Sequence, residues 1–245
     1  MKIKECEVSN NQRTKKLPKI ILGQFSFAIV ITIVAVSISY YAQGFRFDLK
    51  DLSLVRTGVL VLGFQPKDAT VTVNQKVTDS SGGGLALNLS PGNYTVRIDK
   101  NKYASFDQSV KIEAESVSIL DKIVLFLKEP VITELSDQSK IAMISAPSED
   151  LAKSNSITTN NYEIWSGERL ITRFATPIKR AIWYPDFRHI IFSQGREIRI
   201  ISDDGKSDTL LVTLSMDQNS RFAINGRGDE LYFEDQNKFY QAKIK

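Results

Sequence analysis

His189 is the only histidine in the 245 residues, so it is the one side chain that could serve as the imidazole base of a catalytic triad. It stands where a turn leads into the apolar run "IIF" (190–192). The sequence contains no G-x-S-x-G motif, in which a sharp turn exposes a serine nucleophile. We therefore interpret His189 as a polar residue of an edge strand, and predict no catalytic residue and no enzyme activity.

Three carboxylates, Asp203, Asp204 and Asp208, surround a glycine in "SDDGKSD" and would suit a calcium loop. The spacing of an EF-hand is absent, however, and the segment has the composition of a hairpin turn. The segment "SSGGG" (80–84) lacks the Gly-Lys-Ser/Thr run that opens a helix in a phosphate loop, and indicates a flexible hairpin tip. We predict no bound metal ion and no cofactor.

Aromatic side chains provide the first candidates for a binding surface. Trp165 and Trp183 fall where a repeating β unit places its core residues. Tyr184 and Phe187 flank a turn, and exposed rings at such a place suit a sugar or a peptide. We predict Tyr184 and Phe187 as binding residues.

The strand "NYTVRID" (93–99) provides two further candidates. Because side chains alternate between the two faces of a strand, Tyr94, Val96 and Ile98 should pack in a core. Arg97, on the opposite face, and Tyr103, beyond the strand, are left to meet solvent or a partner. We predict both as binding residues.

A long uncharged segment near the N-terminus indicates on which side of a membrane these candidate residues lie. Residues 20–45 carry no charge, and the 22 residues from Ile20 to Tyr41 would span about 33 Å as a helix, which matches a hydrocarbon core of about 30 Å. The sequence predicts a transmembrane helix over 20–43 that binds the lipid bilayer. Lysines precede it and mixed charges follow it, so the positive-inside rule places the N-terminus in the cytoplasm and the rest outside.

A cleaved signal peptide and a buried soluble helix are the two alternatives to an anchor. A cleaved signal peptide would have an apolar region of about 7–15 residues with small residues before the cleavage site. The run here is longer, and cleavage after Ala42 would put the large Tyr40 at position −3, although cleavage nearer Ser37 or Ser39 stays open. A buried soluble helix is disfavoured because the segment has no face polar enough for water.

The net charge of +4 belongs to the first nineteen residues, which hold six basic and two acidic residues. The rest of the chain then holds 26 basic residues (32 − 6) and 26 acidic ones (28 − 2). Nucleic-acid binding usually requires an excess of basic residues on the folded part. We therefore predict no nucleic-acid partner.

Beyond residue 58 the pattern changes to period-two alternation with turn residues every 8–12 positions, which is typical of all-β domains. The expected strands of the first such region are Val59–Phe64, Thr70–Asn74, Leu85–Leu89, Tyr94–Lys100, Gln108–Glu113 and Val117–Leu127. A polar stretch from Ser145 to Asn161 then reads as a long surface loop or linker.

The segments "FQPKDATVTVNQK", "LNLSPGNYTVRIDKNKY" and "SVKIEAE" resemble the PEGA domain. The matching positions are Pro66, Ala69, Val71, Val73, Leu89, Pro91, Gly92, Tyr94, Val96, Lys100 and Tyr103. Asp68 and Lys102 stand where that family usually has glycine, and Lys102 should not adopt a positive φ cheaply, so its turn is expected to differ. The resemblance covers about residues 40–128 and implies an antiparallel β domain of bacterial cell-surface proteins without catalytic activity.

A repeat follows in the last third of the chain. "IWYPDFRHIIF" (182–192) aligns with "AINGRGDELYF" (223–233) at an offset of 41, and each is followed by a short strand. A spacing near 40 suits one blade of a β-propeller, and the first segment resembles TolB-like and WD-type blades. With a partial earlier unit at "YEIWSGERLITRFATP", the chain would hold about two blades and a fragment.

The sequence therefore predicts a mainly β protein with one N-terminal transmembrane helix. The expected parts are a basic cytoplasmic tail (1–19), the helix (20–43), a connector (44–57), a PEGA-like antiparallel domain (58–128) and a propeller-blade-like antiparallel region (129–245). The expected role is noncatalytic: a single-pass protein of the cell membrane that displays its β domains for surface attachment, or binds a cell-wall polymer or an envelope protein. An envelope sensor or assembly factor is the alternative, and self-association is a further expectation because blade edges are left open.

Overall fold

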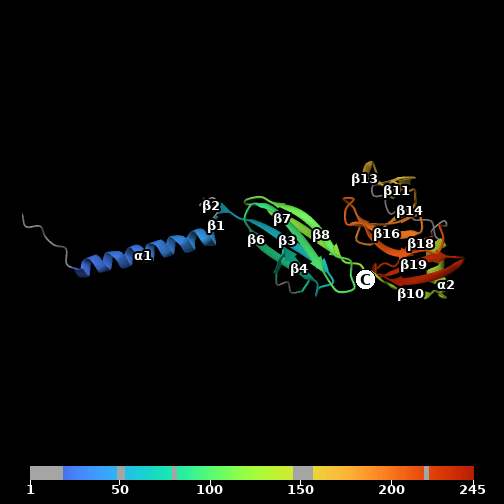
Figure 1. The fold of residues 1–245 in the computed structure, drawn as a ribbon, viewed down its shortest axis with the longest axis horizontal. Helices are drawn as coiled ribbons and strands as arrows, with labels where there is room; N and C mark the ends of the chain where they lie inside the picture. Colours follow the sequence, from blue (N-terminus) through green and yellow to red (C-terminus); the bar gives the residue numbers. More distant parts are fainter. Residues whose placement is uncertain (1–18, 49–52, 79–81, 146–156, 218–220) are drawn as a thin grey trace, which may run out of the picture. The chain divides into compact units, whose positions relative to one another are not determined.

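The computed structural model describes residues 19–48, 53–78, 82–145, 157–217 and 221–245. The chain divides into two units, Met1–Arg56 and Thr57–Lys245. The tail expected at 1–19 lies outside the described residues except for Lys19. The second unit is mainly β, as the alternation of its sequence predicts (Figure 1).

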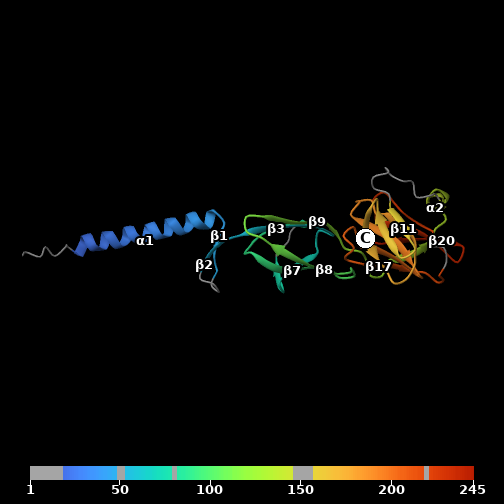
Figure 2. The same cartoon turned by 90° about the horizontal axis from the view of Figure 1, so that it is seen from above.

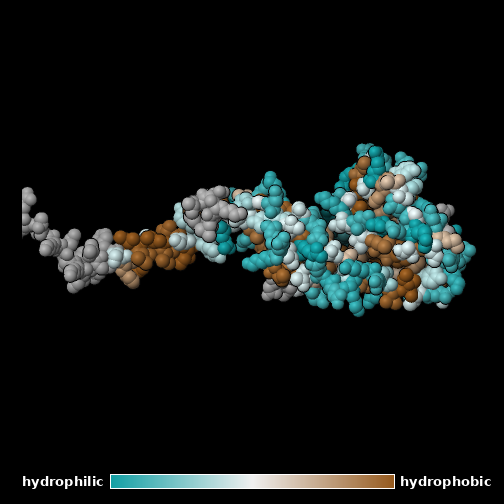
Figure 3. Space-filling view, viewed as in Figure 1, coloured by the Kyte–Doolittle hydropathy of each residue, from teal (hydrophilic) through white to brown (hydrophobic). Residues whose placement is uncertain are grey.

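The first unit contains one helix and a strand pair. Helix α1 (Lys19–Ala42) is followed by β1 (Phe45–Asp48) and β2 (Ser53–Arg56), which pair antiparallel. The expected connector is thus a two-stranded sheet. Apolar side chains predominate on the described part of α1, residues 26–42, with Phe27 68% and Ile38 63% exposed (Figure 3). Among the described residues, no helix is both long enough and apolar enough to cross a membrane.

The first part of the second unit, residues 58–128, is a sandwich of two sheets in the strand orders β6-β3-β9 and β5-β4-β7-β8 (Figure 2). Its strands are β3 (Gly58–Gln65), β4 (Thr70–Val73), β5 (Lys76–Thr78), β6 (Gly84–Leu89), β7 (Gly92–Asp99), β8 (Phe106–Ile112) and β9 (Val117–Val124). All six expected strands coincide with one of these. Most pairs are antiparallel, but β3 and β9 run parallel, which the resemblance did not imply.

Alternation explains the core of this sandwich. Leu60 and Leu62 of β3 and Val96 and Ile98 of β7 point between the sheets and are almost fully buried, and Tyr94 packs against them. The expectation that Tyr94, Val96 and Ile98 pack in a core is confirmed.

Two turns differ from expectation. Lys102 adopts φ = 69°, the left-handed conformation that a glycine would favour, so the expectation that Lys102 would avoid a positive φ was wrong. The "SSGGG" segment is not a hairpin tip, because Gly82 and Gly83 lead from β5 in one sheet to β6 in the other. Ser80 and Ser81 lie outside the described residues.

The second part, residues 129–245, contains three sheets in the orders β11-β12-β13, β14-β15-β16-β17 and β10-β20-β19-β18. The elements are β10 (Val131–Glu134), α2 (Gln138–Ser145), β11 (Ile157–Asn160), β12 (Glu163–Ser166), β13 (Arg169–Arg173), β14 (Ile178–Trp183), β15 (His189–Gln194), β16 (Glu197–Ser202), β17 (Thr209–Thr213), β18 (Phe222–Ile224), β19 (Glu230–Asp235) and β20 (Lys238–Lys243). The sheets are antiparallel throughout. Strand β11 falls inside the stretch expected to be loop, and α2 was not expected.

The β14–β17 sheet packs on both of its faces. Ile190 and Phe192 lie against Ile164 of the β11–β13 sheet, whereas Ile191 and Ile198 lie with residues of β18, β19 and β20. Helix α2 covers the far face of the β18–β20 sheet through Ile144, and lies beside that sheet in both views (Figures 1 and 2). Three sheets and one helix therefore form a layered stack with continuous apolar contacts.

The repeat of 41 residues is visible in the strands. Strands β15 and β16 begin 41 residues before β19 and β20. The sheet that contains β15 and β16 takes its fourth strand from β17, which directly follows β16 in the sequence. The sheet that contains β19 and β20 instead takes its fourth strand from β10, which comes before every other strand of this part and pairs with β20.

His189 does not lie on an edge strand. It begins β15, which is paired on both sides by β14 and β16, and it is only 8% exposed. The sequence placed it correctly at the entry to an apolar strand, but the interpretation as an edge residue was wrong. The alternation that identifies a strand does not say how many neighbours the strand has.

Candidate functional site

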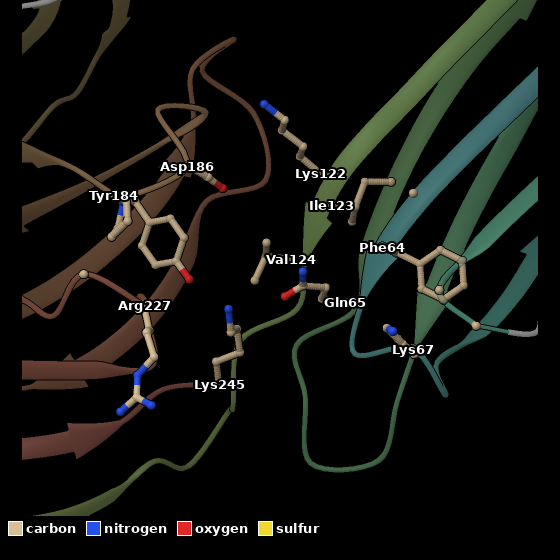
Figure 4. Close-up of a pocket in the computed structure, with 15 residues that line it drawn as sticks. Phe64, Gln65, Lys67, Lys122, Ile123, Val124, Tyr184, Asp186, Arg227 and Lys245 are labelled. Carbon is tan, nitrogen blue, oxygen red and sulfur yellow. The ribbon is translucent and has the colours of Figure 1, made fainter.

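A cavity of about 690 Å³ lies where the two parts of the second unit meet (Figure 4). One wall comes from β3, β9 and the β5–β6 connection, and includes Phe64 and Ile123. The opposite wall comes from two hairpin turns, Tyr184–His189 and Asn225–Glu230, and includes Tyr184 and Asp186. Figure 4 shows Lys245 and Gln65 between these walls.

The two parts are joined covalently and by packing next to this cavity. Phe126, just after β9, is 3% exposed and packs in the core formed by β15–β20. The backbone N–H of Leu127 donates to the carbonyl of Ile244 at 2.9 Å. The cavity is therefore bordered by residues whose backbone is fixed.

Tyr184, Asp186 and His189 form a cluster in the first turn. The Nδ1 atom of His189 lies 2.7 Å from Oδ2 of Asp186, while Oδ1 of Asp186 accepts the backbone N–H groups of Arg188 and His189 at 2.7 and 3.1 Å. The rings of Tyr184 and Phe126 each stand edge-on to the imidazole at 5.9 Å. The imidazole is held by one carboxylate and two aromatic rings, which fixes its orientation.

The phenol of Tyr184 reaches the second turn. Its O–H donates to the carbonyl of Gly228 at 2.8 Å. A Cβ atom on Gly228 would stand 2.3 Å from that phenol oxygen, and Gly228 has φ = 73°. Glycine is therefore required at 228 both by its backbone conformation and by the ring lying against it.

Burial and charge shape the titration of this cluster. Burial, together with the nearby carboxylates of Asp186 and Asp229, raises the pKa of Tyr184 well above its usual range. Burial alone would raise the pKa of Asp186, but the hydrogen bond and charge of His189 and the two backbone N–H groups outweigh it and lower that pKa. Asp186 is therefore an anion at neutral pH, and Tyr184 is a neutral hydrogen-bond donor.

Four cationic side chains line the same cavity from four separate segments: Lys67, Lys122, Arg227 and Lys245. Asp186 is the one acidic side chain among the lining residues that the structure describes. The arrangement can attract an anion, because the carboxylate is already engaged by His189.

The four predicted binding residues are not brought together. Tyr184 is 2% exposed and belongs to the core, so the prediction that its ring is exposed was wrong. Phe187 is 45% exposed with φ = 54°, and its ring lies 6.3 Å from that of Trp183. Arg97 pairs with Asp99 at 2.9 Å on the surface of the first part, and the half-buried Tyr103 packs against that part's core under Lys100.

The other residues singled out in the sequence have structural partners. Trp183 is partly buried and packs against the core between the β11–β13 and β14–β17 sheets. Trp165 is half-buried, and its indole N–H donates to Glu163 at 2.9 Å. The three carboxylates of "SDDGKSD" face cations: Asp203 faces Arg188, Asp204 faces Lys206 and Asp208 faces Arg199.

Sequence reasoning missed the residues that define the cavity. Lys122 and Lys245 lie at the ends of β segments and read as ordinary solvated charges, and Phe126 reads as part of a strand. The available signal was the turn repeat itself, because both copies of it contribute to the cavity wall. The repeat was recognised as a fold signature rather than as a site.

The chain matches none of the family models and none of the curated proteins with which it was compared. The PEGA and propeller resemblances therefore rest on the residues quoted above.

Proposed function

We propose that this chain is a noncatalytic, membrane-anchored protein of the bacterial cell envelope. Residues 20–43 would lie in the bilayer as a single span, with the tail in the cytoplasm and the β unit outside. The unit would consist of a PEGA-like domain and a short propeller-like region, and it would bind a wall component or an envelope protein.

The observation that carries this proposal is the uncharged run of residues 20–45. It is long enough to cross a hydrocarbon core of about 30 Å as a helix. The support comes from the sequence, since side chains 20–25 lie outside those described. The apolar side chains described on α1 are exposed and have no packing partner among the described cores.

The end of α1 adds support for an interface. The rings of Tyr40 and Phe45 meet edge-on at 5.4 Å, Arg46 lies 4.7 Å from the ring centre of Tyr41, and Arg56 lies 4.9 Å from that of Phe45. Aromatic rings and arginines are enriched where an apolar span meets water. This cluster of residues suits the headgroup level of a membrane.

The noncatalytic assignment is supported by the setting of His189. Its ring is enclosed by Phe126 and Tyr184, and its Nδ1 atom is engaged by Asp186. These contacts give the imidazole a structural role in joining the two parts. A binding role is supported by the cavity, which is open and lined by groups from both parts.

Alkaline carbonate extraction of cell membranes tests the anchor. The unchanged protein should stay in the membrane pellet at a mass of 27.6 kDa. An Ile33→Arg/Val34→Asp variant should be released, whereas the matched Thr32→Val variant should stay. Release of the unchanged protein, or a mass lower by the N-terminal segment, would contradict an uncleaved anchor.

A further inference from the structure

We infer that the cavity between the two parts binds a polyanion, a polymer carrying repeated phosphate or carboxylate groups. The inference rests on the proposed binding role and names its ligand class, but it does not depend on the anchor. Its basis is the charge of the cavity, the availability of that charge, and the size and openness of the space.

The charge of the cavity departs from that of the chain. Beyond the first nineteen residues, basic and acidic residues balance at 26 each. The cavity lining instead has four cations against Asp186. Like charges in one concave space repel each other and raise the local potential, and an anion entering the space relieves that repulsion.

The cations are available to a ligand. Among the described residues, no carboxylate lies in ion-pair distance of Lys67, Lys122 or Lys245. Arg227 has a long contact of 3.8 Å with Asp229, and its side chain is 83% exposed. Asp229, which is not a lining residue, is also near Lys245: its pKa is lowered mainly by the hydrogen bond from Asn225, and the charges of Arg227 and Lys245 lower it further. Exposed contacts of this kind are weak and are readily exchanged for a ligand anion.

The space suits a chain with several charges rather than one small ion. A volume of about 690 Å³ lies within the usual range of ligand sites and far exceeds a single phosphate group. Lys67 precedes β4, Lys122 lies in β9, Arg227 lies in the second turn and Lys245 follows β20, so the four charges enter the cavity from four different segments (Figure 4). A ligand with repeated anionic groups can pair with several of them at once.

Two glycines keep the approach open. A Cβ atom at Gly82 or at Gly226 would meet no atom within 4 Å, so the backbone at both lining positions borders free space. Lysine contributes a point charge and arginine a fork of donors, and both bind phosphate and carboxylate groups.

The test measures binding of sodium polyphosphate to the detergent-solubilised full chain by titration calorimetry. Lys122→Gln/Lys245→Gln should weaken binding at least tenfold, because two cations are removed while side-chain length is largely kept. Lys111→Gln/Lys206→Gln, which changes two exposed lysines outside the cavity, should bind as the unchanged protein does. Raising salt from about 50 to 200 mM should weaken binding about 20-fold if three charges are neutralised.

Polyglutamate, which carries carboxylates, and dextran, which is uncharged, test whether binding depends on negative charge. Binding of polyphosphate, polyglutamate or both, lost in the cavity variant, supports the inference. Dextran binding, equal binding by both variants, or no polyanion binding at low salt overturns it. Competition by phosphatidylglycerol micelles at equal phosphate concentration would assign the site to a lipid headgroup and overturn the polymer ligand.

Two controls keep the outcome interpretable. Circular dichroism should show both double variants equally folded. Carbonate extraction of the same variants should leave both in the membrane, so loss of polyanion binding would be distinguishable from failure of the anchor.

Discussion

The turns Tyr184–His189 and Asn225–Glu230 have the same backbone and different side chains. In each, the first residue's N–H donates to the sixth residue's carbonyl, at 2.9 and 3.1 Å, and the fourth residue's N–H donates to the first residue's carbonyl at 2.9 Å. In each, the fourth residue has a positive φ: 54° at Phe187 and 73° at Gly228. The offset of 41 residues is kept position by position.

The difference lies in which side chain caps the turn. In the second turn Asn225, the first residue, accepts the N–H groups of Asp229 and Glu230. In the first turn the equivalent N–H groups are accepted by Asp186, the third residue. Moving the capping group from the first position to the third leaves the first position free for Tyr184, which reaches the second turn and lines the cavity.

Side chains of the first turn join parts of the unit, whereas the second turn is capped by its own Asn225. Phe126 packs against Tyr184 and His189 of the first turn, and the second contributes Gly228, whose carbonyl accepts the O–H of Tyr184. Four substitutions test the different roles of the two turns.

Phe126→Ala should lower the free energy of unfolding by about 3–5 kcal/mol, because a buried aromatic ring that joins the two parts is removed. Phe187→Ala, at an exposed ring, is the matched control and should change it by less than about 1 kcal/mol. Urea denaturation measures both. Similar effects for the two rings would show that Phe126 does not connect the parts.

Gly228→Ala should destabilise by about 2–4 kcal/mol, since it adds left-handed strain and a clash with the phenol of Tyr184. Gly226→Ala, where the added atom meets open space, should have a much smaller effect. If the two alanines are equivalent in thermal denaturation, Tyr184 does not rest on Gly228 as described.

Asp186→Asn should change the pH dependence of stability. The folded pKa of Asp186 is lowered, so its contribution is present above the unfolded value of about 3.9 and is lost as pH falls through the folded value. The variant should therefore lose less stability than the unchanged protein between about pH 5 and pH 2. Asp204→Asn, in a surface turn, is the control, and identical acid profiles for Asp186→Asn and the unchanged protein would argue against the pair with His189.

Phe187→Gly should stabilise slightly, by about 0.5–1 kcal/mol, because relief of left-handed strain exceeds the added entropy of the unfolded chain. The first turn would then resemble the second at this position. A loss of stability would mean that the contact of Phe187 with Trp183 outweighs the strain.

Most strands were predictable because alternation and turn residues are local signals. Six of the seven strands of residues 58–128, all but β5, and β15, β16, β19 and β20 lie where the pattern indicates. Strand β10 was not recognised, because all four of its residues are exposed and its partner lies more than 100 residues away. Helix α2 is eight residues long, which is too short for a clear period, although Asp137 accepts the N–H of Ser139 at its start.

The site was predicted less well than the fold. Phe187 was correctly placed on the surface, but Tyr184 was placed there too, because both flank the same turn. Whether a turn residue points to solvent depends on what packs over the turn, here Gly228 and Phe126, and neither lies nearby in sequence. The cations of the cavity come from four segments, and only the tertiary fold brings them together.

Labelling of cysteines in intact cells with a membrane-impermeant maleimide tests whether the β unit lies outside the membrane. Cys6 is the chain's only cysteine and lies in the proposed cytoplasmic tail, so the unchanged protein serves as its own inside probe. In a Cys6→Ser/Lys111→Cys variant, the single cysteine takes the place of a lysine side chain that is 72% exposed. We expect Cys6 to react only after permeabilisation and the cysteine at 111 to react in intact cells. Labelling of Cys6 in intact cells, with protection of the cysteine at 111, would contradict a β unit displayed outside the membrane.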